Sequence, residues 1–522
     1  IINSAATGTH AAADSTGFHI FSNNITVNGG INTSYMGSAG GDGLGAGQDG
    51  GCGGSGAGYG GDGGSDCGTT LGGFGFGSST EPTALGSGGA NSSGGAGSGG
   101  PGGGYVRLNA SSTLTLAGRV LADGRDGAGT NSTGGGGSGG SIYIRTVILT
   151  GSGMLRANGG ARDTNSGNGG GGRIAIYYTT DSSSLTISAQ GGSGGSARIG
   201  GAGTIYKKSS AASNGDLTID NGGFSGGFTR QIGSNDQTYR NVYACNRGNY
   251  HLSGSARLII ASDGSLQSNN ANQNGTLTNV SSTVVFLNAN TTINGVDVNN
   301  SGIFSLTNLT VTSSIFTNVA TTATFSGLNS LTVGYGATTT FSGATTSTFD
   351  TLTVLNGGTV THKSNTTAKV NTLTLSLATL TVQAGGVIEV SGKGFSADQG
   401  TGAGTRGGCA GGGGGYGGSG GAGCGMNAPG GLTYGNATNP NDLGSGGGYD
   451  NASGGGLTRI YVSGTATING SVNADGASAT TGAGGGGAGG GIWLYIGGTF
   501  AGSGSIYARG GSSLGSGGGG GG

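Results

Sequence analysis

Short apolar–polar–apolar triplets recur along the middle of the chain. Four of them begin at Leu309, Leu331, Leu352 and Leu373, about 21 residues apart, with Gly, Asn and Ser between them. This alternation predicts strands with Leu and Val on one face and Thr on the other. A three-residue strand buries little alone, but strands stacked about 4.8 Å apart form a continuous apolar interior. The block 206–394 is therefore predicted to be a parallel β-helix of turns of about 21 residues.

The middle residues of the four triplets are predicted to form one outward file. These residues are Thr310, Thr332, Thr353 and Thr374. A regular row of hydroxyls suggests a face that binds ice or polysaccharide, whereas Thr also simply suits an exposed strand. An antiparallel β-sandwich is the alternative fold, although its turns usually recur every 8 to 12 residues.

Glycine dominates the segments 35–205 and 395–522. It supplies 134 of the 522 residues, and its runs alternate with short apolar strands such as 142–144 and 492–496. Helix is disfavoured by this composition. Because glycine lacks a Cβ, neighbouring chains can approach closely in left-handed, three-residue-per-turn segments. We expect an all-β chain: a right-handed parallel β-helix with inserted polyglycine-II-like blocks, and with residues 1–34 as further solenoid turns.

The chain repeats itself in register. Cys52 and Cys67 lie as far apart as Cys409 and Cys424, and Thr9-His10 matches Thr361-His362. Glycine-rich composition alone does not align Cys and His. The repeat unit is about 352 residues, so residues 1–352 form one copy and residues 353–522 a partial second copy. The second copy ends at Gly522, just where the counterpart of the strand at 173–178 would begin. We therefore expect a longer natural chain.

Charge and motifs argue against several function classes. Charged residues make up 8% of the chain, where roughly 25% is usual. The 20 basic residues nearly balance the 21 acidic ones. This balance gives no footprint for nucleic acid or an anionic membrane, and no apolar run approaches the ~20 residues of a membrane span. The four histidines show no metal-binding spacing, and the carboxylates are scattered. No catalytic residue, metal or cofactor is predicted; a carbohydrate-active β-helix enzyme ranks third among the functions.

The order of several segments resembles a known class of proteins. FDTLTV (349–354), GGTVTH (357–362) and IEVSGKGF (388–395) are followed by glycine-rich sequence that contains LGSGG (443–447). This succession is similar to the large repetitive glycine-rich surface proteins predicted from many bacterial genomes. The resemblance implies a secreted or cell-surface β-helical protein of adhesin or matrix type. We expect a structural component of a filament, sheath or adhesive layer that associates with itself and contacts a glycan or another surface.

An extracellular location is oxidising and favours disulfides. Together with the equal spacing, it predicts that Cys52 pairs with Cys67 and Cys409 with Cys424. Cys245 is left over by the odd count. We expect it to be buried and unpaired, with a bond to another chain as the alternative.

Overall fold

The computed structural model describes residues 17–522 with eleven short gaps. The gaps are at 52, 68–69, 93–96, 130–133, 162–164, 195–197, 232–234, 269–272, 319–323, 425–426 and 450–451. The chain divides into two compact units, residues 1–288 with 295–297 and residues 289–294 with 298–522, so the division cuts through the predicted block 206–394. All named elements in the described ranges are β-strands, so none of these residues forms a helix that could cross a membrane.

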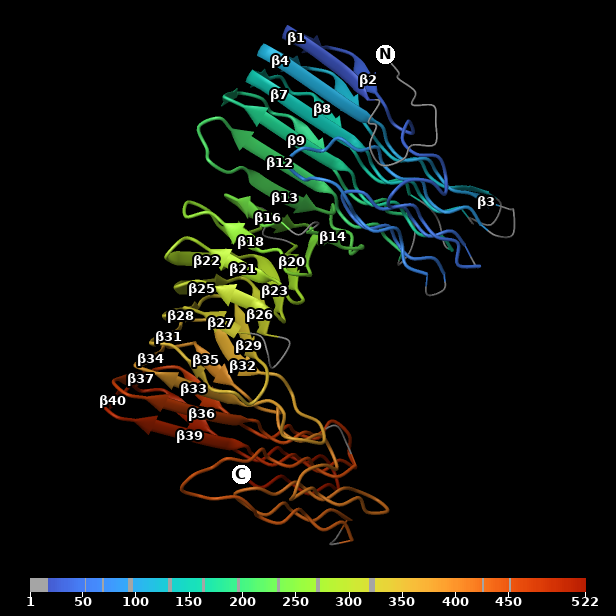
Figure 1. The fold of residues 1–522 in the computed structure, drawn as a ribbon. Helices are drawn as coiled ribbons and strands as arrows, with labels where there is room; N and C mark the ends of the chain where they lie inside the picture. The colour runs from blue at the N-terminus through green and yellow to red at the C-terminus, as the bar shows by residue number, and fades with distance from the viewer. Residues whose placement is uncertain are drawn as a thin grey trace. The chain divides into compact units, whose positions relative to one another are not determined.

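The first unit begins with two parallel sheets. One holds β1 (Phe18–Val27), β4 (Tyr105–Leu116), β7 (Ser141–Thr150), β9 (Arg173–Tyr178) and β12 (Thr204–Ser209). The other holds β2 (Gly30–Asn32), β5 (Arg119–Leu121), β8 (Met154–Arg156) and β11 (Thr186–Ser188). Val106 pairs with Ile142, and Ile142 with Ile174. All three are fully buried, so alternate residues of successive turns fill one interior. Figure 1 shows the strands of the first of these sheets stacked one after another.

Strand direction reverses within the sheet that begins with β1. β12 pairs antiparallel with β13 (Asp216–Asp220), Ile205 lying opposite Thr218. Only six residues, 210–215, join the two strands. A parallel connection needs a crossover of a dozen or more residues, whereas a short loop permits a hairpin. The expectation of an uninterrupted parallel helix is therefore wrong at this point.

Beyond the hairpin the first unit has three parallel sheets. β13 is followed by β16 (Val242–Cys245) and β19 (Leu266–Gln267). The second sheet holds β14 (Thr229–Arg230), β17 (Asn249–Leu252) and β20 (Gly275–Asn279). The third holds β15 (Gln237–Tyr239), β18 (Leu258–Ile260) and β21 (Thr283–Phe286). Two short elements pair elsewhere: β10 (Thr180–Asp181) joins β7, and β3 (Gly97–Ser98) joins β6 (Ala128–Gly129).

The second unit also has a main sheet of parallel strands. That sheet holds β22 (Asn290–Asn294), β25 (Asn308–Thr312), β28 (Ser330–Val333), β31 (Thr351–Val354), β34 (Thr379–Val382), β37 (Ala466–Ile468) and β40 (Phe500–Ala501). Leu309, Leu331, Leu352 and Leu380 pair in register, each at most 1% exposed. They form the apolar interior column that the triplets predict.

Three further sheets complete the second unit. One holds β23 (Val296–Asn300), β26 (Ile315–Asn318), β29 (Thr338–Phe341), β32 (Thr359–His362), β35 (Val387–Glu389), β38 (Ser471–Asn473) and β41 (Ser505–Tyr507). Another holds β30 (Ser347–Thr348), β33 (Leu373–Leu377), β36 (Leu457–Val462) and β39 (Gly491–Ile496). β24 (Ile303–Ser305) pairs with β27 (Thr324–Ser326).

The glycine-rich segments form a hydrogen-bonded bundle in each unit. We call the described residues of 37–140, 157–172 and 189–203 outside the strands the first glycine bundle, and the described residues of 394–456, 474–491 and 508–522 outside the strands the second. In Figure 1 the first bundle lies to one side of its unit's stacked strands. The bundle backbones extend out from the turns and bond to one another, not to the strands alone.

Within a bundle, hydrogen bonding follows a period of three. In residues 485–490, the N–H groups of the first and fourth residues donate to carbonyl oxygens of the segment 445–448. Those of the second and fifth residues donate to the segment 518–521, and those of the third and sixth to the segment 474–477. Residues 135–140 follow the same rule. The N–H groups of each of these two segments therefore donate to three neighbouring segments, whereas those of a β-strand donate to at most two.

Candidate functional site

The outward face of the second unit's main sheet carries a file of threonines. Thr310 pairs with Thr332, Thr332 with Thr353 and Thr353 with Thr381. These residues are partly exposed and alternate with the buried Leu and Val of the same strands. Thr292 and Thr467 extend the file to β22 and β37. Six successive strands thus present a threonine at the same register position.

A second polar file runs beside the first. It consists of Asn290, Asn308, Ser330, Thr351 and Thr379, which are also paired in register. Asn308 Nδ2 donates to Asn290 Oδ1 at 2.9 Å, and Ser330 Oγ donates to Asn308 Oδ1 at 2.9 Å. The two files together make a polar surface with one strand about every 4.8 Å.

The hydroxyls of the central file differ from those beside it. Within the described residues, the side chains of Thr310, Thr332 and Thr353 make no hydrogen bond to other protein groups. A hydroxyl has one donor and two acceptor positions. These three side chains therefore keep their full capacity for water or for the hydroxyls of a ligand.

The prediction that Thr374 belongs to this file is wrong. Thr374 lies in β33, in another sheet, where it pairs with Arg459. Its Oγ1 is 3.1 Å from Thr372 Oγ1. The turn that starts at β31 is longer than the preceding ones, because the loop 363–372 and β33 precede β34. The evenly spaced triplets therefore belong to two different sheets. Thr381 occupies the position in the file that was predicted for Thr374.

The cysteines occupy the bundles and a strand. Cys409 and Cys424 form a disulfide in the second bundle, with their Cα atoms 5.9 Å apart. Cys67 in the first bundle is disulfide-bonded, and Cys52 lies outside the described residues. Cys245 at the end of β16 is a buried thiol, with its Sγ 3.8 Å from Ile219 O and from Asp220 Oδ2.

Ion pairs between successive turns recur in both units. Asp123 Oδ2 is 2.8 Å from Arg156 Nη2 in the first, and Asp475 Oδ2 is 2.6 Å from Arg509 Nη2 in the second. The two carboxylates hold matching places in the repeat, because each belongs to the middle residue of an Ala-Asp-Gly sequence. These side chains fasten one turn to the next.

His362 is built into the second unit as a neutral side chain. It is fully buried in β32. Its Nδ1 donates to Lys363 O at 2.7 Å, and its Nε2 accepts from the N–H of Leu457 at 3.2 Å. Burial lowers the pKa of His362 to about 4. His10, its counterpart in the first copy, lies outside the described residues.

No cluster that could hold a metal ion is formed by the His, Cys, Asp and Glu residues in the described ranges. One buried cation was not predicted from the sequence. Arg173 at the start of β9 is 2% exposed, although it opens an otherwise apolar strand. A single basic residue before a run of Ile, Ala and Tyr was the available signal.

Comparison with family models, curated proteins and solved structures gave no significant match. The functional argument therefore rests on the geometry of the files, bundles and charged groups.

Proposed function

We propose that the chain is a structural segment of an extracellular filament, sheath or cell-surface adhesive layer. The observation that carries this proposal is the repetition of one braced module. A parallel strand stack, a three-neighbour glycine bundle and an Asp–Arg pair between turns occur in both units. A chain that repeats its framework is suited to spanning distance, because each added copy supplies the same contacts again.

Two finer features belong to this proposal. The strand stacks are right-handed β-helices, as expected where parallel strands are joined by crossovers. The bundles are polyglycine-II-like, which is supported by the period-three hydrogen bonds. The disulfide within the second bundle fits a secreted location, since such bonds persist in oxidising compartments. Copies of the chain associate through the edge strands at the two ends of the longest sheet, β1 and β40.

Association can be tested on the chain itself. Sedimentation velocity and negative-stain microscopy over a hundredfold range of concentration should show assemblies that lengthen as concentration rises. Microscopy of the native material should show fibres or a continuous layer. A chain that remains monomeric at the highest concentration, in material with no ordered assembly, would contradict the proposal.

A second candidate function is binding of polysaccharide or ice on the threonine file. The specific observation in its favour is the row of hydroxyls on Thr310, Thr332 and Thr353 that make no protein hydrogen bond. Regularly spaced hydroxyls can bond to ordered water or to successive sugar units.

Glycan-array binding and thermal hysteresis test this second candidate. Replacing Thr332 and Thr353 by Lys should abolish the signal, because two long cationic side chains interrupt the flat polar surface. The matched control is Thr338→Lys, a partly exposed position in β29 of another sheet. Equal signals from the two variants would exclude the threonine file as the binding face.

A further inference from the structure

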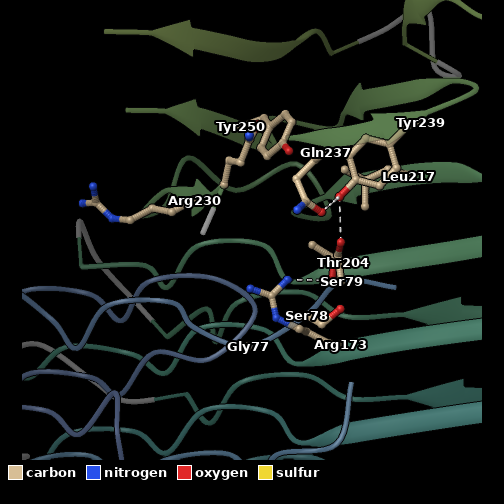
Figure 2. Close-up of a pocket in the computed structure, with 11 residues that line it drawn as sticks. Gly77, Ser78, Ser79, Arg173, Thr204, Leu217, Arg230, Gln237, Tyr239 and Tyr250 are labelled. Atoms are coloured by element: carbon tan, nitrogen blue, oxygen red, sulfur yellow. Dashed lines mark hydrogen bonds between the residues drawn. The ribbon is translucent and has the colours of Figure 1, made fainter. Parts of the chain in front are cut away.

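A cleft in the first unit lies beside the buried Arg173. Its volume is about 260 Å³. Figure 2 shows the Arg173 guanidinium on one side of this space and the side chains of Gln237, Tyr239 and Tyr250 on the other. Pockets for drug-sized ligands have roughly 300–1,000 Å³. This cleft is suited to a molecule of the size of one sugar.

The guanidinium of Arg173 is held by neutral groups. Its Nε donates to Phe76 O at 2.8 Å, its Nη1 to Thr204 Oγ1 at 3.1 Å, and its Nη2 to Tyr59 O at 3.4 Å. A guanidinium has five N–H donors, so these contacts leave donor capacity. Arg173 makes no ion pair within the described residues.

Asp62, a carboxylate whose charge acts on Arg173, already pairs with another arginine. Asp62 Oδ2 is 2.6 Å from Arg230 Nε, and the Arg230 guanidinium also lies 4.8 Å from the centre of the Phe74 ring. Burial lowers the pKa of Arg173. A buried cation without a paired anion is unfavourable, and an anion that enters the cleft removes this imbalance.

The opposite wall is mainly polar, and its charged lining residue, Arg230, is paired with Asp62. Gln231 Oε1 is buried and has no hydrogen-bond partner. The Tyr239 hydroxyl lies 2.7 Å from Ser79 Oγ, and Tyr250 is 2% exposed. A buried acceptor without a donor is unfavourable, so the complementary ligand donates a hydrogen bond here. The lining residues that the structure describes include no Asp or Glu, which disfavours a ligand with an ammonium group.

We propose that this cleft binds one carboxylate-bearing sugar, with its carboxylate on Arg173 and a ring hydroxyl donating to Gln231. Arginine matches the planar carboxylate because its N–H groups can donate in parallel. The unpartnered amide oxygen requires a hydroxyl as well as the charge. A simple anion satisfies only the first requirement, and a neutral sugar only the second.

Calorimetric titration of the full chain tests this assignment with four probes. D-galacturonate should bind saturably. D-galactose, which lacks the carboxylate, and acetate, which lacks the hydroxyls, should each bind at least tenfold more weakly, and so should inorganic phosphate. Equal binding of galactose would overturn the role of the charge. Tighter binding of acetate or phosphate than of galacturonate would overturn the assignment to a sugar.

Variants locate the site. Arg173→Gln should weaken galacturonate binding at least tenfold, whereas Arg145→Gln, at an exposed arginine of β7, should leave it unchanged. Because Arg173 also contacts the first bundle, Gln231→Met provides an independent variant: it should weaken galacturonate binding severalfold and leave acetate binding unchanged. Galacturonate binding that survives either cleft variant at full strength would overturn the proposal.

Discussion

The strand stacks and the glycine bundles solve the same packing problem in opposite ways. In the stacks, Leu and Val side chains fill the space between sheets, as at Leu352, which is fully buried. In the bundles, the backbones themselves fill the space. A Cβ placed on Gly487 would lie 2.1 Å from Ser453 O, and one on Gly170 would lie 2.1 Å from Gly61 O. Stability in the first region depends on side chains being present, and in the second on their absence.

The largest effect is expected from adding a methyl group to a bundle. Gly487→Ala forces a Cβ against a carbonyl oxygen whose own segment is hydrogen-bonded to further neighbours. We expect the free energy of unfolding to fall by about 4 kcal/mol or more. Denaturant unfolding measures it.

The same substitution a few residues away is the matched control. An added Cβ at Gly482 has no atom within 4 Å, so Gly482→Ala should be neutral or slightly stabilising, by up to about 1 kcal/mol. Equal effects at Gly487 and Gly482 would show that the bundle is not close-packed.

Removing side-chain atoms should have the converse effect in a stack. Leu352→Ala deletes part of the interior column, and we expect a loss of about 3 to 4 kcal/mol in the free energy of unfolding. Tyr335→Ala, at a side chain that is 79% exposed, should change it by less than about 0.5 kcal/mol. Comparable losses from the two variants would contradict the assigned interior.

The disulfide allows the bundle to be tested separately from the stack, because it closes a loop within the bundle. Replacing both Cys409 and Cys424 by Ser should lower the free energy of unfolding by about 3 kcal/mol, the value for a loop of about 15 residues. The loss should appear as faster hydrogen exchange in residues 405–424, with little change in β25 to β34. A loss spread evenly over the second unit would indicate that its bundle and stack unfold together.

A smaller effect is expected from acid on the stack. His362 has its pKa lowered to about 4 by burial, below an unfolded value of about 6.5. The unfolded chain therefore binds more protons in this interval. The contribution is fully present above pH 6.5 and is lost as the pH falls towards 4, with a maximum on the order of 3 kcal/mol.

His362→Gln should remove this part of the pH dependence, measured as the slope of unfolding free energy between pH 6.5 and 4. His19→Gln, at an exposed position of β1, should change the slope less, because partial burial lowers the pKa of His19 less strongly. An unchanged slope in His362→Gln would show that the side chain titrates normally in the folded state.

Sequence pattern predicted the stacks better than their connections. The alternation at Leu309, Leu331 and Leu352 set both the strand and its buried face, since period two is a local property of the chain. Thr374 was misplaced because spacing alone does not tell which sheet a strand joins. The reversal between β12 and β13 was missed as well, although the short loop 210–215 carries its signal.

The binding features depend more strongly on contacts distant in sequence. Arg173 meets Tyr59 and Phe76 across roughly a hundred residues, and no local pattern encodes that approach. The bundle partners are likewise set by which glycine runs the strand stack brings together. The equal Cys spacing was the one sequence signal that linked positions within a bundle.

Hydrogen exchange read by mass spectrometry tests most directly whether the glycine segments are folded framework and not flexible connections. The amides of residues 485–490 each donate to a backbone carbonyl. We predict that they exchange as slowly as those of β31 and β34 in the same unit, by at least about a thousandfold relative to an unstructured chain. Exchange of these glycine amides at the unprotected rate, while the strands remain protected, would contradict the account.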